Sequence, residues 1–296
     1  EDALIQQRGE SVAALADEFE RIARAEGVTA VREGGPDASL DAWLQSVPRR
    51  PGVLPIERFR NGQLEVSVLP ARGGRIYRMR QVATGRDLLQ VLGSETARIP
   101  DDGGYEEYSE PGYRSAGWSE VYIVKERGES SLVLEANLRN GLRLTRKLEL
   151  DPTRPLLKIT STVTNDSSQS RTSGLRAHPE FAVTSTARAT VRILGKEGAW
   201  RTFPLANPAD PAAEKNVWLR EDDCPAGKWA VVDEQARMAI LNQFDTGQVS
   251  HCLLNWNGRT SRVNLELFAP ERILAPGESQ TIEHSYEVVA PDALGG

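Results

Sequence analysis

The feature that most constrains this chain is a period-two alternation of apolar and polar side chains, which recurs from Val53 almost to the C-terminal end. Successive side chains of a β-strand point to opposite faces of the sheet, so this alternation is typical of strands with one buried face. The segments that show it most clearly are 64–69, 121–124, 131–138, 141–150, 157–163, 190–194, 229–232, 238–241, 261–268 and 280–289.

Turn residues separate these segments, as in Arg139-Asn-Gly, Asp151-Pro and Ala275-Pro-Gly-Glu. Such residues favour the tight connections of antiparallel strands. No helical periodicity intervenes between one strand and the next. Residues 53–296 are therefore predicted to form one all-β domain, a large antiparallel β-sandwich of more than ten strands.

Residues 1–52 follow a different pattern. Apolar residues recur at helical spacing in residues 1–26, Gly27 is placed to end that helix, and a second short helix is expected over 39–45. The Pro/Arg stretch 48–51 has the composition of a linker. This helical N-terminal segment is typical of a connector from an upstream domain or of a brace packed on the sheet. The chain begins with Glu1, and we expect it to be part of a longer protein.

Composition and charge exclude several classes of partner. No run approaches the roughly 18 apolar residues of a membrane span, so no membrane partner is expected. The net charge is −6 and no Lys/Arg patch offsets it, which disfavours nucleic acid. Cys224 and Cys252 stand 28 positions apart, a spacing compatible with one disulfide or with two free thiols. A cytoplasmic and an exported location both stay open.

His178 is one of three histidines in the chain and lies in the segment 173–181. The segment follows a predicted strand and a polar run, so we expect His178 between that strand and the next one, which begins at Phe181. An imidazole whose pKa is near 6.5 transfers protons at neutral pH and also hydrogen-bonds to hydroxyl groups. A packed structural histidine is the alternative.

Four segments, in this order, resemble the galactose mutarotase-like (aldose 1-epimerase-like) superfamily. The first runs from 64 to 89 and includes Pro70-Ala-Arg-Gly-Gly-Arg-Ile-Tyr and Thr84-Gly-Arg-Asp-Leu-Leu. The others are the strand 157–165, which ends in Asn165; the segment 174–181, similar to the family's Gly-x-x-x-His-Pro-Tyr-Phe; and Val263-Asn-Leu-Glu-Leu-Phe with the turn that follows Leu274. The resemblance spans about residues 56–290 and implies the family's β supersandwich.

The resemblance also implies two catalytic residues. In the epimerases a Glu acts as general base on the anomeric hydroxyl and a His protonates the ring oxygen; the matching positions here are Glu266 and His178. The alternative for Glu266 is a solvated strand residue, since alternation places it on one face with Asn264. The chain departs from the family where Glu180 replaces the tyrosine after His-Pro. We expect Glu180 to raise the pKa of His178 and hold it as imidazolium.

Further residues are candidates for sugar binding. The family has a second His in a Gly-rich segment before the central strands, but the matching region, 101–113, has none. Residues 101–118 instead form a predicted loop rich in carboxylates and aromatic rings, groups that bind sugar hydroxyls and stack on sugar C–H faces. An exposed acidic loop is the alternative. The predicted substrate-binding residues are Arg75, Tyr105, Glu106, Glu107, Trp118, Arg176, Glu180 and Trp256, the last in a turn over 255–258.

No cofactor is predicted. Asp101, Asp102, Glu106 and Glu107 carry oxygen atoms that suit Ca²⁺, but a solvated acidic loop is the favoured interpretation, so no metal is predicted either. We expect a saccharide ligand and rank three functions. The first is a carbohydrate-binding or accessory domain of a carbohydrate-active protein. The second is a sugar mutarotase that uses His178 and Glu266, and the third is a glycoside hydrolase or polysaccharide lyase. Whether the chain is an enzyme is left open.

Overall fold

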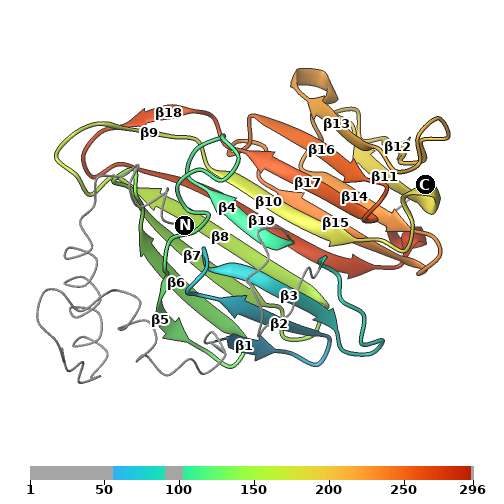
Figure 1. The fold of residues 1–296 in the computed structure, drawn as a ribbon, viewed down its shortest axis with the longest axis horizontal. Helices are drawn as coiled ribbons and strands as arrows, with labels where there is room; N and C mark the ends of the chain where they lie inside the picture. The colour runs from blue at the N-terminus through green and yellow to red at the C-terminus, as the bar shows by residue number, and fades with distance from the viewer. Residues whose placement is uncertain (1–55, 91–102, 295–296) are drawn as a thin grey trace, which may run out of the picture. The chain divides into compact units, whose positions relative to one another are not determined.

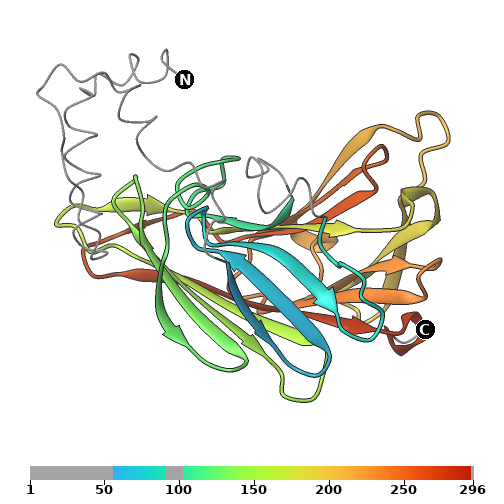
Figure 2. The same cartoon turned by 60° about the horizontal axis from the view of Figure 1, so that its bottom comes forward.

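The structure, a computed structural model, describes residues 56–90 and 103–294. These residues form two large antiparallel sheets, and Figures 1 and 2 show the sheets as two layers. The eight-stranded sheet has the order β1 (Glu57–Arg60), β2 (Leu64–Leu69), β3 (Arg75–Gln81), β4 (Gly104–Tyr108), β10 (Arg176–Ala182), β17 (Arg262–Phe268), β16 (His251–Asn257) and β13 (Glu214–Leu219).

The nine-stranded sheet has the order β12 (Trp200–Pro204), β11 (Ala189–Leu194), β14 (Lys228–Asp233), β15 (Met238–Phe244), β19 (Ser279–Val289), β8 (Leu156–Thr164), β7 (Arg143–Leu150), β6 (Ser131–Asn137) and β5 (Ile123–Arg127). The short strands β9 (Arg171–Ser173) and β18 (Arg272–Leu274) pair with each other. The described residues also include the 3₁₀ helices η1 (Thr186–Arg188), η2 (Glu221–Asp223) and η3 (Pro291–Leu294).

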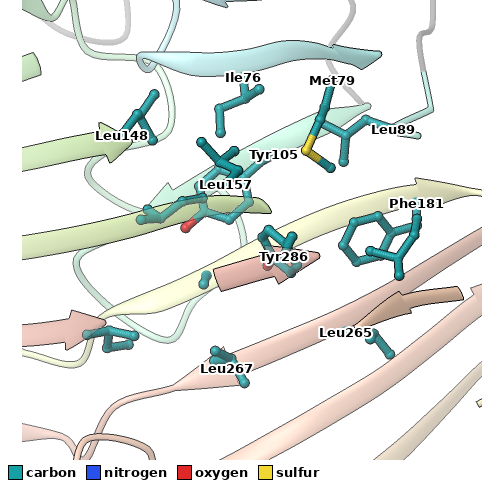
Figure 3. Close-up of a cluster of buried hydrophobic side chains, with 14 of the residues drawn as sticks. Ile76, Met79, Leu89, Tyr105, Leu148, Leu157, Phe181, Leu265, Leu267 and Tyr286 are labelled. Carbon is teal, nitrogen blue, oxygen red and sulfur yellow. The ribbon is translucent and has the colours of Figure 1, made fainter. Parts of the chain in front are cut away.

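The core lies between the two large sheets and is built by the alternation seen in the sequence. In β8, for example, Leu157, Ile159 and Val163 are fully buried while the residues between Leu156 and Thr164 on the other face are partly exposed. Side chains from both sheets meet in this core, as Figure 3 shows for Ile76, Phe181 and Leu265 of the eight-stranded sheet and Leu148, Leu157 and Tyr286 of the nine-stranded one. The predicted all-β antiparallel sandwich is confirmed.

Three local predictions were wrong. Residues 104–108, predicted as loop, form β4 in the middle of the eight-stranded sheet. His178 lies within β10 rather than between two strands. Asn255 and Trp256, predicted in a turn, belong to β16. All three strands are buried on both faces, so none shows the apolar and polar alternation of a strand with one solvated face.

The helices predicted within residues 1–52 lie outside the described residues, as do Asp101 and Asp102. The division at residue 52 stays a prediction. In the described part of the chain, no helix has the length and apolar character needed to cross a membrane. Cys224 and Cys252 are both free thiols, and their sulfur atoms are 3.8 Å apart.

Candidate functional site

Six of the ten candidate residues lie on the outer face of the eight-stranded sheet, the face turned away from the other large sheet. They are Arg75, Glu106, Arg176, His178, Glu180 and Glu266. Antiparallel register places directly opposed residues on one face, and it aligns three rows across β4, β10, β17 and β16, two of which continue onto β13. The rows are Tyr108, Arg176, Phe268 and His251; Glu106, His178, Glu266, Leu253 and Trp218; and Gly104, Glu180, Asn264, Asn255 and Asn216.

His178 and Glu266, the two predicted catalytic residues, contact each other at the centre of this face. Nε2 of His178 is 3.5 Å from Oε1 of Glu266 and 3.3 Å from Nδ2 of Asn264. Both residues are almost completely buried, with 4% of His178 and 1% of Glu266 exposed. The two residues therefore lie side by side on adjacent strands, and their catalytic roles stay a prediction.

Arg176 binds the other oxygen of Glu266. Its Nε and Nη2 atoms donate to Oε2 of Glu266 at 2.7 and 2.6 Å, and its Nη1 donates to the backbone carbonyl of Pro111 at 2.9 Å. The guanidinium also packs over the rings of Tyr108 and Phe268. Two donors on one carboxylate oxygen are a strong, charge-assisted contact that fixes the position of Glu266.

Two further ion pairs flank this centre. Arg75 of β3 pairs with Glu106 of β4, and both side chains are buried. Arg262 of β17 donates to Glu180 of β10 at 3.2 Å. Together with Arg176 and Glu266, they form a buried ionic cluster around His178. Burying charge is costly unless each charge is paired, and the alternation of Arg and Glu across the strands meets that condition.

The pKa of His178 departs from the prediction. We expected Glu180 to raise it, but the pKa lies well below the usual value of 6.5 because burial disfavours the charged ring. The positive charges of Arg176, Arg262 and Arg75 lower it further, while Glu180 is engaged by Arg262. At neutral pH His178 is therefore a neutral imidazole, not the imidazolium that a general acid requires.

Burial has the opposite effect on Glu266 and raises its pKa from 4.5 to about 7, although Arg176 opposes the shift. A carboxyl group whose pKa is raised on folding contributes stability that is complete below pH 4.5 and is lost as the pH rises through about 7. We expect the free energy of unfolding of Glu266→Gln, relative to the parent, to rise by on the order of 3 kcal/mol between these limits.

Urea unfolding of the parent and of Glu266→Gln at a series of pH values measures this difference. Glutamine mimics the protonated carboxyl, so taking the difference removes the contributions of groups that titrate alike in both proteins. The ¹³C signal of the Glu266 carboxyl gives the pKa directly. A difference that stays constant from pH 4.5 to pH 8 would show that Glu266 ionises as an ordinary solvated carboxyl does.

The loop after β4 covers one side of the cluster. The ring of Tyr113 packs against His178 and Tyr108, with centroid distances of 5.7 and 6.1 Å, yet 51% of the residue is exposed. Arg114 stacks between Tyr113 and Trp118. Trp118, a predicted sugar-binding residue, therefore lies in this loop and contacts Arg114, whereas Tyr113 is the exposed ring beside the cluster.

Tyr105 and Glu107 do not join the cluster, which corrects their predicted placement with the sugar-binding residues. Neighbours in a strand point to opposite faces, so Glu106 faces the cluster while Tyr105 and Glu107 face the core. There Glu107 accepts from Nε of Arg146 and from Oγ of Ser161, both at 2.6 Å. Figure 3 shows Tyr105 among the core side chains.

Trp256 also faces away from the cluster. It pairs with Val263, a core residue, and packs edge-on against Phe203 with 5.7 Å between ring centroids. Its burial in the core excludes the predicted role as an exposed stacking surface.

Arg262 was missed by the sequence analysis, although a signal for it exists. It stands two positions before Asn264 and four before Glu266, so alternation along β17 places all three on one face. Its Nη2 atom donates to Glu214 at 2.9 Å and thereby links the cluster to β13. Among the described residues, no group of three or more His, Cys, Asp or Glu side chains is arranged to hold a metal ion.

Comparison with known proteins identifies the fold. No family model matches the chain, and no curated protein matches its sequence. Solved structures do match. A candidate aldose 1-epimerase from Escherichia coli K12 is 18% identical with a TM-score of 0.63, over 80% of this chain and 99% of that one. A galactose mutarotase-like protein from Lactobacillus casei is 12% identical with a TM-score of 0.61, over 79% of this chain and all of that one.

A third match covers only part of a longer protein. A TPR-domain containing protein from Parabacteroides distasonis is 11% identical with a TM-score of 0.57, and the match covers 78% of this chain but 46% of that one. The likeness to these structures shows that the chain has the galactose mutarotase-like fold.

Proposed function

We propose that this chain, with its galactose mutarotase-like fold, is a carbohydrate-binding accessory domain that does not turn its ligand over. The observation that carries the proposal is the buried ionic cluster, which holds a set of polar and aromatic groups at its exposed rim. These are the exposed ring of Tyr113, the partly buried Arg262 and the exposed Asn216. An exposed ring and fixed hydrogen-bonding groups on one sheet face suit a sugar, which has both C–H faces and hydroxyls.

The geometry of the central pair argues against mutarotation. That reaction needs an acid and a base on opposite sides of one C–O bond, each within about 2.6–3.2 Å of its oxygen. His178 and Glu266 are instead almost completely buried and only 3.5 Å from each other. The depressed pKa of His178 also leaves it without the proton that a general acid donates.

The match to the TPR-domain containing protein supports an accessory role. The fold there occupies less than half of a longer chain, as expected for a module attached to other domains. Mutarotase activity is the second candidate, because His178 and Glu266 are both present and adjacent. No contact of the described residues favours a hydrolase or a lyase.

We expect a panel of neutral monosaccharides to include ligands that bind in calorimetric titrations. Arg262→Ala should weaken this binding by roughly ten- to a hundredfold, since it removes a charged hydrogen-bond donor from the rim. Glu283→Gln is the matched control: Glu283 is a half-exposed residue of an ion pair on the other sheet, and binding should not change.

Polarimetry on the same sugars separates the two candidates. We expect no mutarotation above the uncatalysed rate. A robust rate that is abolished by both His178→Ala and Glu266→Gln, but not by Glu283→Gln, would make the protein an epimerase instead.

A further inference from the structure

A second group of aromatic residues lies on the same sheet face as the ionic cluster, toward its β13 edge. Trp218, His251 and Phe268 contact one another; the His251 and Phe268 rings are stacked with 4.5 Å between centroids, and Trp218 is 5.7 and 5.4 Å from them. We call these three residues the aromatic platform. Trp218 is 50% exposed, which is unusual for the largest apolar side chain.

The platform is joined to the cluster by direct packing. Phe268 is opposite Arg176 in the register, and the Arg176 guanidinium lies 5.0 Å from the Phe268 ring centre. Arg220 lies over the Trp218 ring at 5.5 Å. Trp218 is therefore held in place on the sheet while half of its surface stays accessible.

Polar groups fixed by hydrogen bonds stand beside the platform. Asn255 donates to Glu214 at 2.9 Å and to Asn216 at 2.8 Å, and Arg262 donates to Glu214. Glu214, Asn216 and Trp218 alternate along β13 on the outer face, so the exposed indole has an amide and a carboxylate on its own strand. An aromatic face with adjacent hydrogen-bonding groups is suited to a pyranose ring.

The distance between the two exposed rings sets the size of the ligand. Tyr113 packs on His178 of β10, and Trp218 is on β13, three strands away in the order β10, β17, β16 and β13. Neighbouring strands are about 4.8 Å apart, so the backbones of β10 and β13 beneath the two rings are about 14 Å apart. This span is well beyond the width of a single sugar ring and matches a short chain of sugars.

We propose that the ligand is a neutral oligosaccharide that lies across strands β10 to β13, with one sugar at Tyr113 and another stacked on Trp218. The half-exposed carboxylate of Glu214 along this path is paired with Arg262, so the two charges offset each other, which favours an uncharged chain. This inference rests on the proposed function and names the class of ligand that the site takes.

Calorimetric titration with cello-oligosaccharides and manno-oligosaccharides, from the monosaccharide to the pentasaccharide, tests the proposal. Affinity should rise by roughly tenfold or more once the chain is long enough to reach Trp218. Trp218→Ala should abolish this gain, whereas Trp218→Tyr, which keeps an aromatic face, should retain most of it. Ile273→Ala, at an exposed apolar residue outside this sheet, is the control.

The outcomes distinguish this inference from the proposed function. Monosaccharide binding with no gain for longer chains, or a gain that survives Trp218→Ala, would overturn the oligosaccharide proposal and leave the proposed function standing. Tighter binding of oligogalacturonate than of the neutral series would overturn the assignment of an uncharged ligand. Failure of the parent to bind any saccharide would overturn both.

Discussion

Replacing Arg146 by methionine is expected to lower the free energy of unfolding by about 3–5 kcal/mol. Arg146 is fully buried between the sheets, where it binds Glu107 at 2.6 Å and the backbone carbonyl of Gly74 at 2.6 Å. Methionine fills a similar volume but supplies no charge. The Glu107 carboxylate would then be buried without its counterion, which is the costly outcome of breaking a buried ion pair.

Urea unfolding measures this loss, and two variants make it specific. Lys147→Met alters the next residue of β7, which pairs with Glu149 at the surface; exposed pairs contribute at most about 1 kcal/mol. Arg146→Met combined with Glu107→Gln removes both charges and should recover much of the stability. If Arg146→Met costs no more than Lys147→Met, the buried pair does not stabilise the fold as argued.

Gly104→Ala is expected to cost about 4 kcal/mol, from backbone strain and from overpacking together. Gly104 has a φ of +83°, and a Cβ atom there would lie 2.4 Å from the backbone oxygen of Ile76. Only glycine lets β4 approach β3 this closely, and that approach brings Glu106 against Arg75. Both the cluster and the packing of β4 against β3 therefore require glycine at position 104.

Two other glycines separate strain from overpacking. Gly85 has a φ of +66° but open space around a Cβ position, so Gly85→Ala should cost only the strain, about 1–2 kcal/mol. Gly62 has neither feature, and Gly62→Ala should change the free energy of unfolding by no more than about 1 kcal/mol. Equal losses for Gly85→Ala and Gly104→Ala would show that β4 and β3 tolerate a methyl group between them.

Strands β1, β12 and β13 were not predicted. The sequence was sufficient to predict strands such as β6, β7, β8 and β19, since alternation is a local pattern. It misled for β4, whose residues Glu106 and Glu107 have the composition of an exposed loop. These carboxylates are buried because Arg75 and Arg146, far away in sequence, pair with them on opposite faces of the strand. A local pattern carries no information about such long-range pairs.

Only part of the site could be predicted, because its contacts also join residues that are far apart in the sequence. Family resemblance located His178 and Glu266, and their contact follows from the register of β10 and β17. The direction of the His178 pKa shift could not be predicted, because burial, its main cause, depends on the packing of distant strands. In addition, the neighbouring Glu180 is bound by Arg262 of another strand. No sequence pattern indicated that Trp218 lies near the site, since its position depends on β13 joining the sheet beside β16.

The position of β19 has a consequence for how the chain acquires its structure. Its 11 residues, 279–289, lie in the middle of the nine-stranded sheet and pair with β15 on one side and β8 on the other. Until a ribosome has released this segment, the sheet exists only as two halves, each with an unpaired edge. Unpaired edges readily join other chains, so the nascent protein is exposed to aggregation until β19 is inserted.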